Sequence, residues 1–423
     1  MDSVGFRSIF NNDINNILVA SSGGNMTPAE YQRAVNAILD GQPGLLAQNV
    51  GLPEAVIYPS SVATTFDKYI EEVTPIAHPV HRDSPYGARQ SQALKKLFGL
   101  GTDPLSLTID ACRKRGIPIV ASFRMNAEDY YHAQILMSDF ERRHPEWKIA
   151  DANCLDPAVP QVYEHRMKIF SEVAQRFDVD GLEFDFRRWH HMVSDPLRNH
   201  VVLTRMVHDA REMLDKTARE KGCKKLILGA RVGPSLATDP SPFVYPGCFN
   251  TEKPQNASCK DLGLDVRTWI QEGWVDYVCP TLFNSFLPGL PKTVEFVELA
   301  TGTAVGVYPT LWPLAAWQTQ IVNARRKKRL RLSFDPRHEK ALALYKHDLC
   351  TAALRIYEDG ADGISTFNWN AHLRNAHMPY VWTEAAGTEA GTSAIQTHIY
   401  PLLKDPAAIL RYREEPWALP PEG

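Results

Sequence analysis

The chain has 423 residues, of which 44% are hydrophobic, 22% charged and 10% aromatic, with a formal net charge of −3 at pH 7. This length fits one large barrel with additions or two to three ordinary domains. The small net charge gives no reason to expect a nucleic acid or a membrane as partner, and the sequence holds no run of about 18 apolar residues that would span a bilayer.

Along the chain one unit recurs, a short apolar strand with polar residues at its end, followed by a helical pattern. The first strand is predicted within 7–19 and ends in Asn11, Asn12 and Asp13. Further strands are predicted at 44–50, 117–126, 182–187, 225–232, 275–283, 303–311 and 361–370. Helical patterns lie between them, at 104–115, 159–177 and 196–220. Thr27 and Glu30 form a capping-box arrangement that opens an earlier helix. The connection 51–100 is long for a compact domain, and such connections are usually functional or an inserted subdomain.

Eight strands that alternate with helices predict an α/β fold, a (β/α)8 TIM barrel with long βα loops and a short C-terminal extension. We expect residues 1–380 to form the barrel and to be the catalytic domain. Residues 381–423 are too few for an independent domain, so we expect them to pack on the barrel, with a short helix at 401–412. Barrels of this class carry their sites at the carboxyl ends of the strands.

The strand at 182–187 alternates large apolar residues with the charged residues Glu183, Asp185 and Arg187, a period of two. Helical patterns flank it, so it should be parallel and covered on both faces. In an open sheet the charged face would be buried at high cost, whereas in a closed barrel it can rise toward the mouth. We therefore expect these charges to line a pocket. The alternative is a solvent-facing alternation on an edge strand.

If the barrel forms, the residues at its strand ends and in the adjoining loops can be taken from the sequence. The expected substrate-binding residues are Asp13, Arg124, Asn126, His132, Arg187, Arg231, Asn284, Tyr308, Trp312, Asn368 and Trp369. A set of this kind suits a sugar, because aromatic faces pack on C–H surfaces and Asn or Arg binds hydroxyls or an acidic substituent. Two carboxyl groups then supply the acid and the base or nucleophile that cleave a glycosidic bond.

The sequence shows no P-loop, no glycine-rich dinucleotide turn and no Ser-His-Asp grouping, so no cofactor is expected. His190 and His191 are adjacent and would point to opposite sides of an extended chain. Because no H-x-H or H-E-x-x-H pattern occurs, no metal site is predicted, although a metal-dependent hydrolase is an alternative. The expected partner is a carbohydrate substrate, and the oligomeric state is not predicted.

Three motifs together resemble the glycosyl-hydrolase-like group of bacterial TIM-barrel proteins. They are Ile9-Phe10-Asn11-Asn12-Asp13 on the first strand, Arg124-Met125-Asn126 at the end of the third, and Asp180-Gly181-Leu182-Glu183-Phe184-Asp185-Phe186-Arg187 on the fourth. The match spans residues 8–370 in order and spacing. The resemblance implies a TIM barrel and carbohydrate-directed hydrolysis, without a settled substrate.

Resemblance to better-known barrels implies roles for the fourth strand. In the amylase-like pattern D-G-x-R-x-D the last Asp is the nucleophile, and Asp185 matches it. In the chitinase-like pattern D-G-x-D-x-D-x-E the terminal Glu is the acid, and Arg187 stands in its place, which argues against a chitinase mechanism. Strand five offers Arg231 where amylases carry their acid.

We therefore assign Asp185 as nucleophile or general base. Glu183, one layer deeper, is either the partner acid or a buried charge oriented by Arg124 or Arg231, and Glu128 or Asp129 is the next candidate acid. The arginines near the mouth suggest an acidic substrate such as a uronate or a sulfated sugar, unless they form salt bridges inside the barrel. A carbohydrate-binding barrel without turnover is a further alternative, because of Arg187.

The compartment stays open. Residues 1–7 lack a hydrophobic signal core, so we expect either a cytoplasmic protein or a secreted or periplasmic one from which the signal peptide has been removed. Seven cysteines are an odd number, and Cys248 and Cys259 could pair in an oxidising compartment. The cysteines in helix or strand patterns are expected to be small core residues: Cys112, Cys223, Cys279 and Cys350.

Overall fold

The computed structural model of the chain describes residues 5–13, 15–18, 26–68, 85–125, 138–150, 152, 154–187, 191–237, 257–282, 289–312, 336–367 and 400–415. Its central sheet is parallel, and its strands are β1 (Ser8–Asn12), β2 (Leu45–Gly51), β5 (Ile119–Arg124), β6 (Gly181–Asp185), β7 (Ile227–Val232), β8 (Tyr277–Pro280), β9 (Gly306–Val307), β10 (Thr310–Leu311) and β11 (Ile364–Phe367).

The sheet closes on itself through β9 and β10. The strands pair in the order β10-β11-β1-β2-β5-β6-β7-β8-β9. Only Tyr308 and Pro309 separate β9 from β10, and the backbone N–H of Tyr308 donates to Val278 while the carbonyl of Pro309 accepts from Ser365. The two short strands are thus halves of one strand that pairs with β8 at one end and with β11 at the other. The nine strands of the path therefore amount to the eight of the predicted (β/α)8 barrel.

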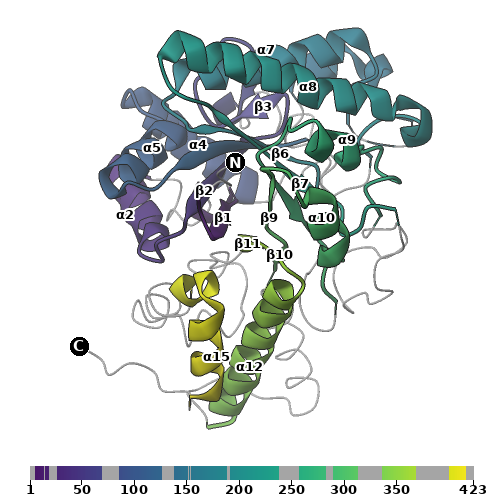
Figure 1. Ribbon diagram of the computed structural model, residues 1–423. Helices are drawn as coiled ribbons and strands as arrows, with labels where there is room; N and C mark the ends of the chain where they lie inside the picture. The colour runs from purple at the N-terminus through teal and green to yellow at the C-terminus, as the bar shows by residue number, and fades with distance from the viewer. Residues whose placement is uncertain are drawn as a thin grey trace.

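Helices follow the strands and lie outside the sheet, as Figure 1 shows. They are α1 (Asn15–Leu18), α2 (Pro28–Leu39), α4 (Pro85–Gly99), α5 (Pro104–Arg115), α6 (Asp139–Arg143), α7 (Pro160–Arg176), α8 (Pro196–Lys221), α9 (Val266–Gln271), α10 (Thr293–Ala300), α12 (Pro336–Glu358) and α15 (Pro406–Glu414). Short elements are β3 (Ala55–Val56), β4 (Thr64–Thr65), η2 (Phe66–Lys68), η4 (Pro145–Trp147) and η6 (Tyr400–Lys404). Helices α7 and α8 pack side by side, as do α2 and α5.

Local signals in the sequence explain the helix ends. The Thr27 hydroxyl accepts from the Glu30 backbone N–H at 3.2 Å, and the Glu30 carboxylate accepts from the Thr27 N–H at 2.8 Å, so the predicted capping box forms at α2. Asp103 caps α5 by accepting from the Ser106 N–H at 2.9 Å, and Gly116 ends that helix with a φ of 65°.

The end of the first strand agrees with the prediction. Strand β1 ends at Asn12, within the predicted end at Asn11, Asn12 and Asp13, and α1 begins at Asn15. The connection 51–100 carries secondary structure of its own, formed by β3, β4, η2 and α4, and its role stays a prediction.

Cys223 is exposed and not a core residue, since Gly222 ends α8 with a φ of 69° and turns the chain into solvent. Cys112, Cys279 and Cys350 are buried as expected. Cys259 is a free buried thiol, and Cys248 lies outside the described residues.

Residues 400–415 pack back onto the body of the chain. The Tyr400 ring lies 5.2 Å from the Phe10 ring between centroids, and the Tyr357 hydroxyl donates to the Leu403 carbonyl at 2.6 Å. Helix α15 contacts α12, beside which it lies in Figure 1. The boundary between residues 380 and 381 falls outside the described residues and stays a prediction. Among the described helices, none combines the length and the apolar character needed to cross a bilayer.

Candidate active site

The lower part of the barrel interior is apolar. Its buried residues are Ile9, Leu45, Ala47, Val120, Tyr277, Cys279 and Tyr308. The Tyr308 hydroxyl donates to the carbonyl of Phe6, at the amino-terminal end of the strands, over 2.8 Å. Tyr308 therefore points away from the carboxyl ends of the strands, which corrects its expected place among substrate-binding residues. It faces inward as predicted, but its strand continues to Leu311, so its side chain lies near the base of the barrel.

Above this layer, the carboxyl group of Glu183 accepts three hydrogen bonds from three other strands. Its Oε1 accepts from Asn11 Nδ2 at 2.9 Å and from Ser122 Oγ at 2.8 Å, and its Oε2 accepts from the Tyr277 hydroxyl at 2.8 Å. The residue is 1% exposed. Burial raises the pKa of the Glu183 carboxyl, and the neighbouring charge of Asp185 raises it further. The described hydrogen bonds of Glu183 come from Asn11, Ser122 and Tyr277 and not from an arginine, although the charge of Arg231 lowers the pKa of Glu183 against the larger effect of burial.

A glycine makes the contact between Glu183 and Tyr277 feasible. In the strand register Glu183 pairs with Gly229, and Gly229 pairs with Tyr277. The Tyr277 side chain thus crosses over the middle strand to reach the carboxylate. A Cβ atom at position 229 would lie 2.0 Å from Tyr277 Cζ, so any other residue would collide with the ring. Sequence reasoning missed both residues, although a glycine inside a strand is a recognised sign of close approach.

Asp185 lies at the carboxyl end of β6 and is held from two directions. Arg231 Nε donates to Asp185 Oδ1 at 2.8 Å, and Arg231 Nη2 donates to Oδ2 at 2.7 Å. The backbone N–H of Arg187 also donates to Oδ1, at 2.9 Å. Asp185 is 1% exposed and Arg231 is 0% exposed. Two-point pairs of this kind are among the strongest hydrogen-bonded contacts of a carboxylate.

Arg231 is fixed on its other side by an aromatic ring. Its guanidinium carbon lies 3.9 Å from the centroid of Phe367, within the range of a cation–π contact. The Trp312 ring packs edge-on against the same Phe367 ring, with 4.5 Å between centroids, and is buried. Trp312, predicted to bind substrate, thus contacts Phe367, which in turn contacts Arg231 of the Asp185–Arg231 pair.

A second ion pair completes the group. Arg124 Nη2 lies 3.0 Å from Asp13 Oδ1, and both side chains are buried. Arg124, Asp185 and Arg231 occupy paired positions on β5, β6 and β7. We call the group formed by Asp13, Arg124, Asp185, Arg187 and Arg231 the charged layer. The charged layer holds three guanidinium groups and two carboxylates, so its formal net charge is one positive charge.

Arg187 is buried in the barrel, where its Nε donates to the carbonyl of Thr281 at 2.8 Å. Burial lowers the pKa of Arg187 to about 9, and the charge of Arg231 acts in the same direction. Glu183, Asp185 and Arg187 are each 1% exposed, so they face the barrel interior, and whether they line a pocket stays a prediction. The edge-strand alternative is wrong, because β6 is paired with β5 and with β7.

Five predicted substrate-binding residues lie outside the described residues and stay predictions: Asn126, His132, Asn284, Asn368 and Trp369. The same holds for Glu128 and Asp129 as candidate acids. Within the described part of the chain, one group could offer three ligands to a metal ion, formed by His208, Asp209 and Glu212 of α8. Asp209 already accepts from the Tyr163 hydroxyl at 2.6 Å.

Comparison with known proteins gives relatives for part of the chain. No family model matches it. The glycosyl hydrolase YngK of Bacillus subtilis (strain 168) is 26% identical over 203 residues, which cover 44% of this chain and 39% of YngK. The glycosyl hydrolase DigH of Escherichia coli (strain K12) is 24% identical over 212 residues, which cover 44% of this chain and 47% of DigH. The chain thus spans less than half the length of the curated relatives that it matches.

The resemblance to glycosyl-hydrolase-like proteins that the three motifs indicated is confirmed by these two relatives. Among solved structures, the glycoside hydrolase domain of PgaB (BpsB) from Bordetella bronchiseptica aligns with 92% of this chain and 98% of its own, at 8% identity and a TM-score of 0.44. A likeness of that degree supports no inference about activity.

Proposed function

We propose that this protein is a glycoside hydrolase that cleaves an oligo- or polysaccharide by a two-carboxylate mechanism. The observation that carries the proposal is Asp185, an oriented carboxylate at the carboxyl end of a barrel strand with Glu183 two positions below it. The names of the two curated relatives agree with this class of reaction.

Asp185 is the nucleophile or general base in this proposal. Three hydrogen-bond donors hold its carboxylate in a fixed orientation. A carboxylate oxygen has two lone pairs, and Oδ1 already accepts two hydrogen bonds. Oδ2 accepts one described hydrogen bond, from Arg231. It therefore keeps a lone pair that can attack a sugar carbon or accept a hydrogen bond from a water.

Glu183 is the first candidate for the partner acid. Burial and the charge of Asp185 raise its pKa, and a carboxyl group with a raised pKa is suited to protonate a leaving oxygen. Its depth in the barrel and its three donors count against this role, and Glu128 and Asp129 are the next candidates.

The charged layer supports an acidic sugar as substrate. Its positive charges exceed its negative ones by one, and arginine guanidinium groups bind carboxylate and sulfate groups well. A uronate or sulfate group would provide such an anion. Equal activity on neutral and acidic oligosaccharides would contradict this part of the proposal.

A second candidate function is carbohydrate binding without turnover. The observation that favours it is the burial of both carboxylates, each 1% exposed and each held by three donors. The two functions differ in what they release. The purified chain is incubated with neutral, uronate-containing and sulfated oligosaccharides, and new reducing ends are measured alongside binding. New reducing ends that are lost in Asp185→Asn support the hydrolase, whereas binding with no product supports the second function.

A further inference from the structure

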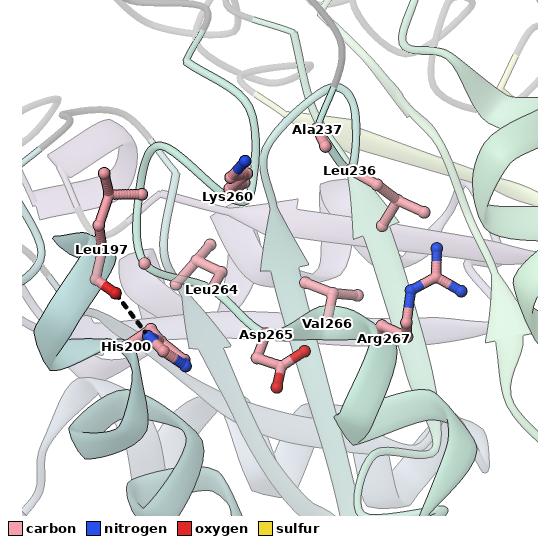
Figure 2. A pocket seen from close by; sticks show the side chains of 10 residues that line it. Leu197, His200, Leu236, Ala237, Lys260, Leu264, Asp265, Val266 and Arg267 are labelled. Atoms are coloured by element: carbon pink, nitrogen blue, oxygen red, sulfur yellow. Dashed lines mark hydrogen bonds between the residues drawn. The ribbon is translucent and has the colours of Figure 1, made fainter.

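A surface hollow of about 360 Å³ opens between the first turn of α8 and the loop that leads into α9 (Figure 2). Its lining is formed by Leu197, His200, Leu236, Ala237, Lys260, Gly263, Leu264, Asp265, Val266 and Arg267. The helices and loops concerned follow β6 and β7, so the hollow lies on the side of the barrel where the carboxyl ends of the strands are. None of its lining residues belongs to the charged layer.

The hollow has an apolar floor and an exposed apolar wall. Leu264 and Val266 are buried beneath it, whereas Leu197 is 65% exposed at its side. One turn along α8, Val201 is 57% exposed. Such side chains lose hydrophobic free energy by facing water, so exposed apolar residues beside a concave surface mark a binding site more often than a bare surface does.

Cations surround this apolar surface. Lys260 and Arg267 are exposed and His200 is partly exposed. Asp265 is the acidic residue of the lining, and its carboxylate is engaged in capping α9, where Oδ1 accepts from the Thr268 N–H at 3.3 Å and Oδ2 from the Thr268 hydroxyl at 2.6 Å. The lining thus holds two permanent cations and one carboxylate, a balance that favours an anionic ligand.

The loop 257–265 connects the hollow to the charged layer. Cys259 is buried, and the charge of Arg187 acts on its thiol, although burial prevails and raises the pKa of Cys259 to about 12. The next residue, Lys260, is exposed and lines the hollow. One side of this loop therefore lies toward Arg187 and the other side toward the hollow.

We propose that the hollow is a subsite for an acidic saccharide. The C–H face of a sugar ring packs on Leu197 and Leu264, and a carboxylate or sulfate group of the sugar binds Lys260 and Arg267. This inference rests on the proposed carbohydrate-directed function and gives its substrate class at a position beyond the charged layer.

Binding is measured by calorimetry on the full chain that carries Asp185→Asn, so that no probe is turned over. The probes are tetrasaccharides of galacturonate, of hyaluronan and of chondroitin sulfate, with cellotetraose as the neutral comparison. We expect at least one acidic probe to bind more tightly than cellotetraose. The double charge reversal Lys260→Glu with Arg267→Glu should lower the affinity for that probe at least tenfold. It should leave the melting temperature unchanged, because both residues are exposed.

The matched control is Lys216→Glu. Lys216 is 70% exposed on the same helix, and 19 residues at 1.5 Å each place it about 28 Å from Leu197. The Lys216→Glu variant should bind the acidic probe with the affinity of the parent. Leu197→Ser should lower the affinity for the acidic probe, because it removes the apolar wall.

The outcomes separate this inference from the proposed function. If the wild-type chain hydrolyses no saccharide but the charge reversal abolishes binding, the result supports the subsite and contradicts the proposed hydrolase function. If hydrolysis is observed and the charge reversal leaves the affinity for every acidic probe unchanged, the result contradicts the subsite. A hexaglutamate peptide that binds as tightly as the best acidic saccharide would overturn the assignment to a sugar.

Discussion

Asp185 and Arg231 stand opposite each other on neighbouring strands and form a two-point ion pair in which both side chains are almost fully buried. The pair joins β6 to β7 at the level where the proposed chemistry takes place. A buried pair of this kind adds little to stability compared with apolar residues of similar shape, but the loss of one partner leaves an uncompensated buried charge. Its effect on stability is therefore asymmetric, and this can be measured.

Arg231→Met should destabilise the protein by about 3–5 kcal/mol, because Asp185 would remain buried without its cation. The double variant Arg231→Met with Asp185→Leu should recover much of that loss. Urea unfolding followed by circular dichroism measures both, and Arg198→Met, at a side chain 86% exposed, is the control. A single variant no less stable than the Arg198 control would contradict the account of the pair.

Gly229→Ala should destabilise the protein by about 1–3 kcal/mol or more, because the new methyl group would occupy the place of the Tyr277 ring. Combining it with Tyr277→Leu should cost less than the sum of the two single changes. Gly99→Ala is the matched control, since an added Cβ there meets no atom within 4 Å and the residue ends a helix. Additive effects of Gly229→Ala and Tyr277→Leu would show that the ring does not cross over the glycine.

Tyr277→Phe should destabilise the protein more at high pH than at low pH. The Tyr277 hydroxyl lowers the pKa of Glu183 against the larger effect of burial, so its removal raises that pKa further. The pKa of Glu183 in the folded state already lies above its ordinary value, so its stabilising contribution is present below that value and is lost as the pH rises through the folded pKa. The free energy of unfolding is compared between pH 4 and 9. A wild-type–variant difference that does not change with pH would refute this role.

Glu141 supplies a pH dependence outside the barrel interior. Burial raises its pKa from 4.5 to about 7 despite Lys148, which lies 3.1 Å away. The folded state therefore holds the proton more tightly than the unfolded state, and about 3 kcal/mol of stability is lost as the pH rises from about 4.5 to 7. Glu141→Gln should flatten the stability curve in this window. A curve as steep as that of the wild type would contradict the assignment.

The sequence predicted the barrel and the face of the central strand because both follow from local periodicity. The alternation around Glu183 and Asp185 sets the inward face, and the capping box at Thr27 fixes the start of α2. The Tyr277–Glu183 hydrogen bond joins residues 94 positions apart and depends on the register of three strands. No local pattern predicts that register.

The pairing of the arginines also depends on the closed barrel. The sequence left open whether they bind substrate or form internal salt bridges. In the structure Arg231 binds Asp185 and Arg124 lies beside Asp13, so the internal alternative holds for these two. Burial of the pairs follows from how the strands stagger around the barrel, which the order of residues along one strand does not reveal.

The most direct test of the proposed function is the rate of saccharide hydrolysis by Asp185→Asn. The account predicts a fall of about 10²–10⁴-fold in kcat relative to the wild type, with folding verified by circular dichroism. Glu220→Gln, at a side chain 52% exposed on α8, should keep the wild-type rate. Wild-type turnover by the folded Asp185→Asn protein would contradict the account.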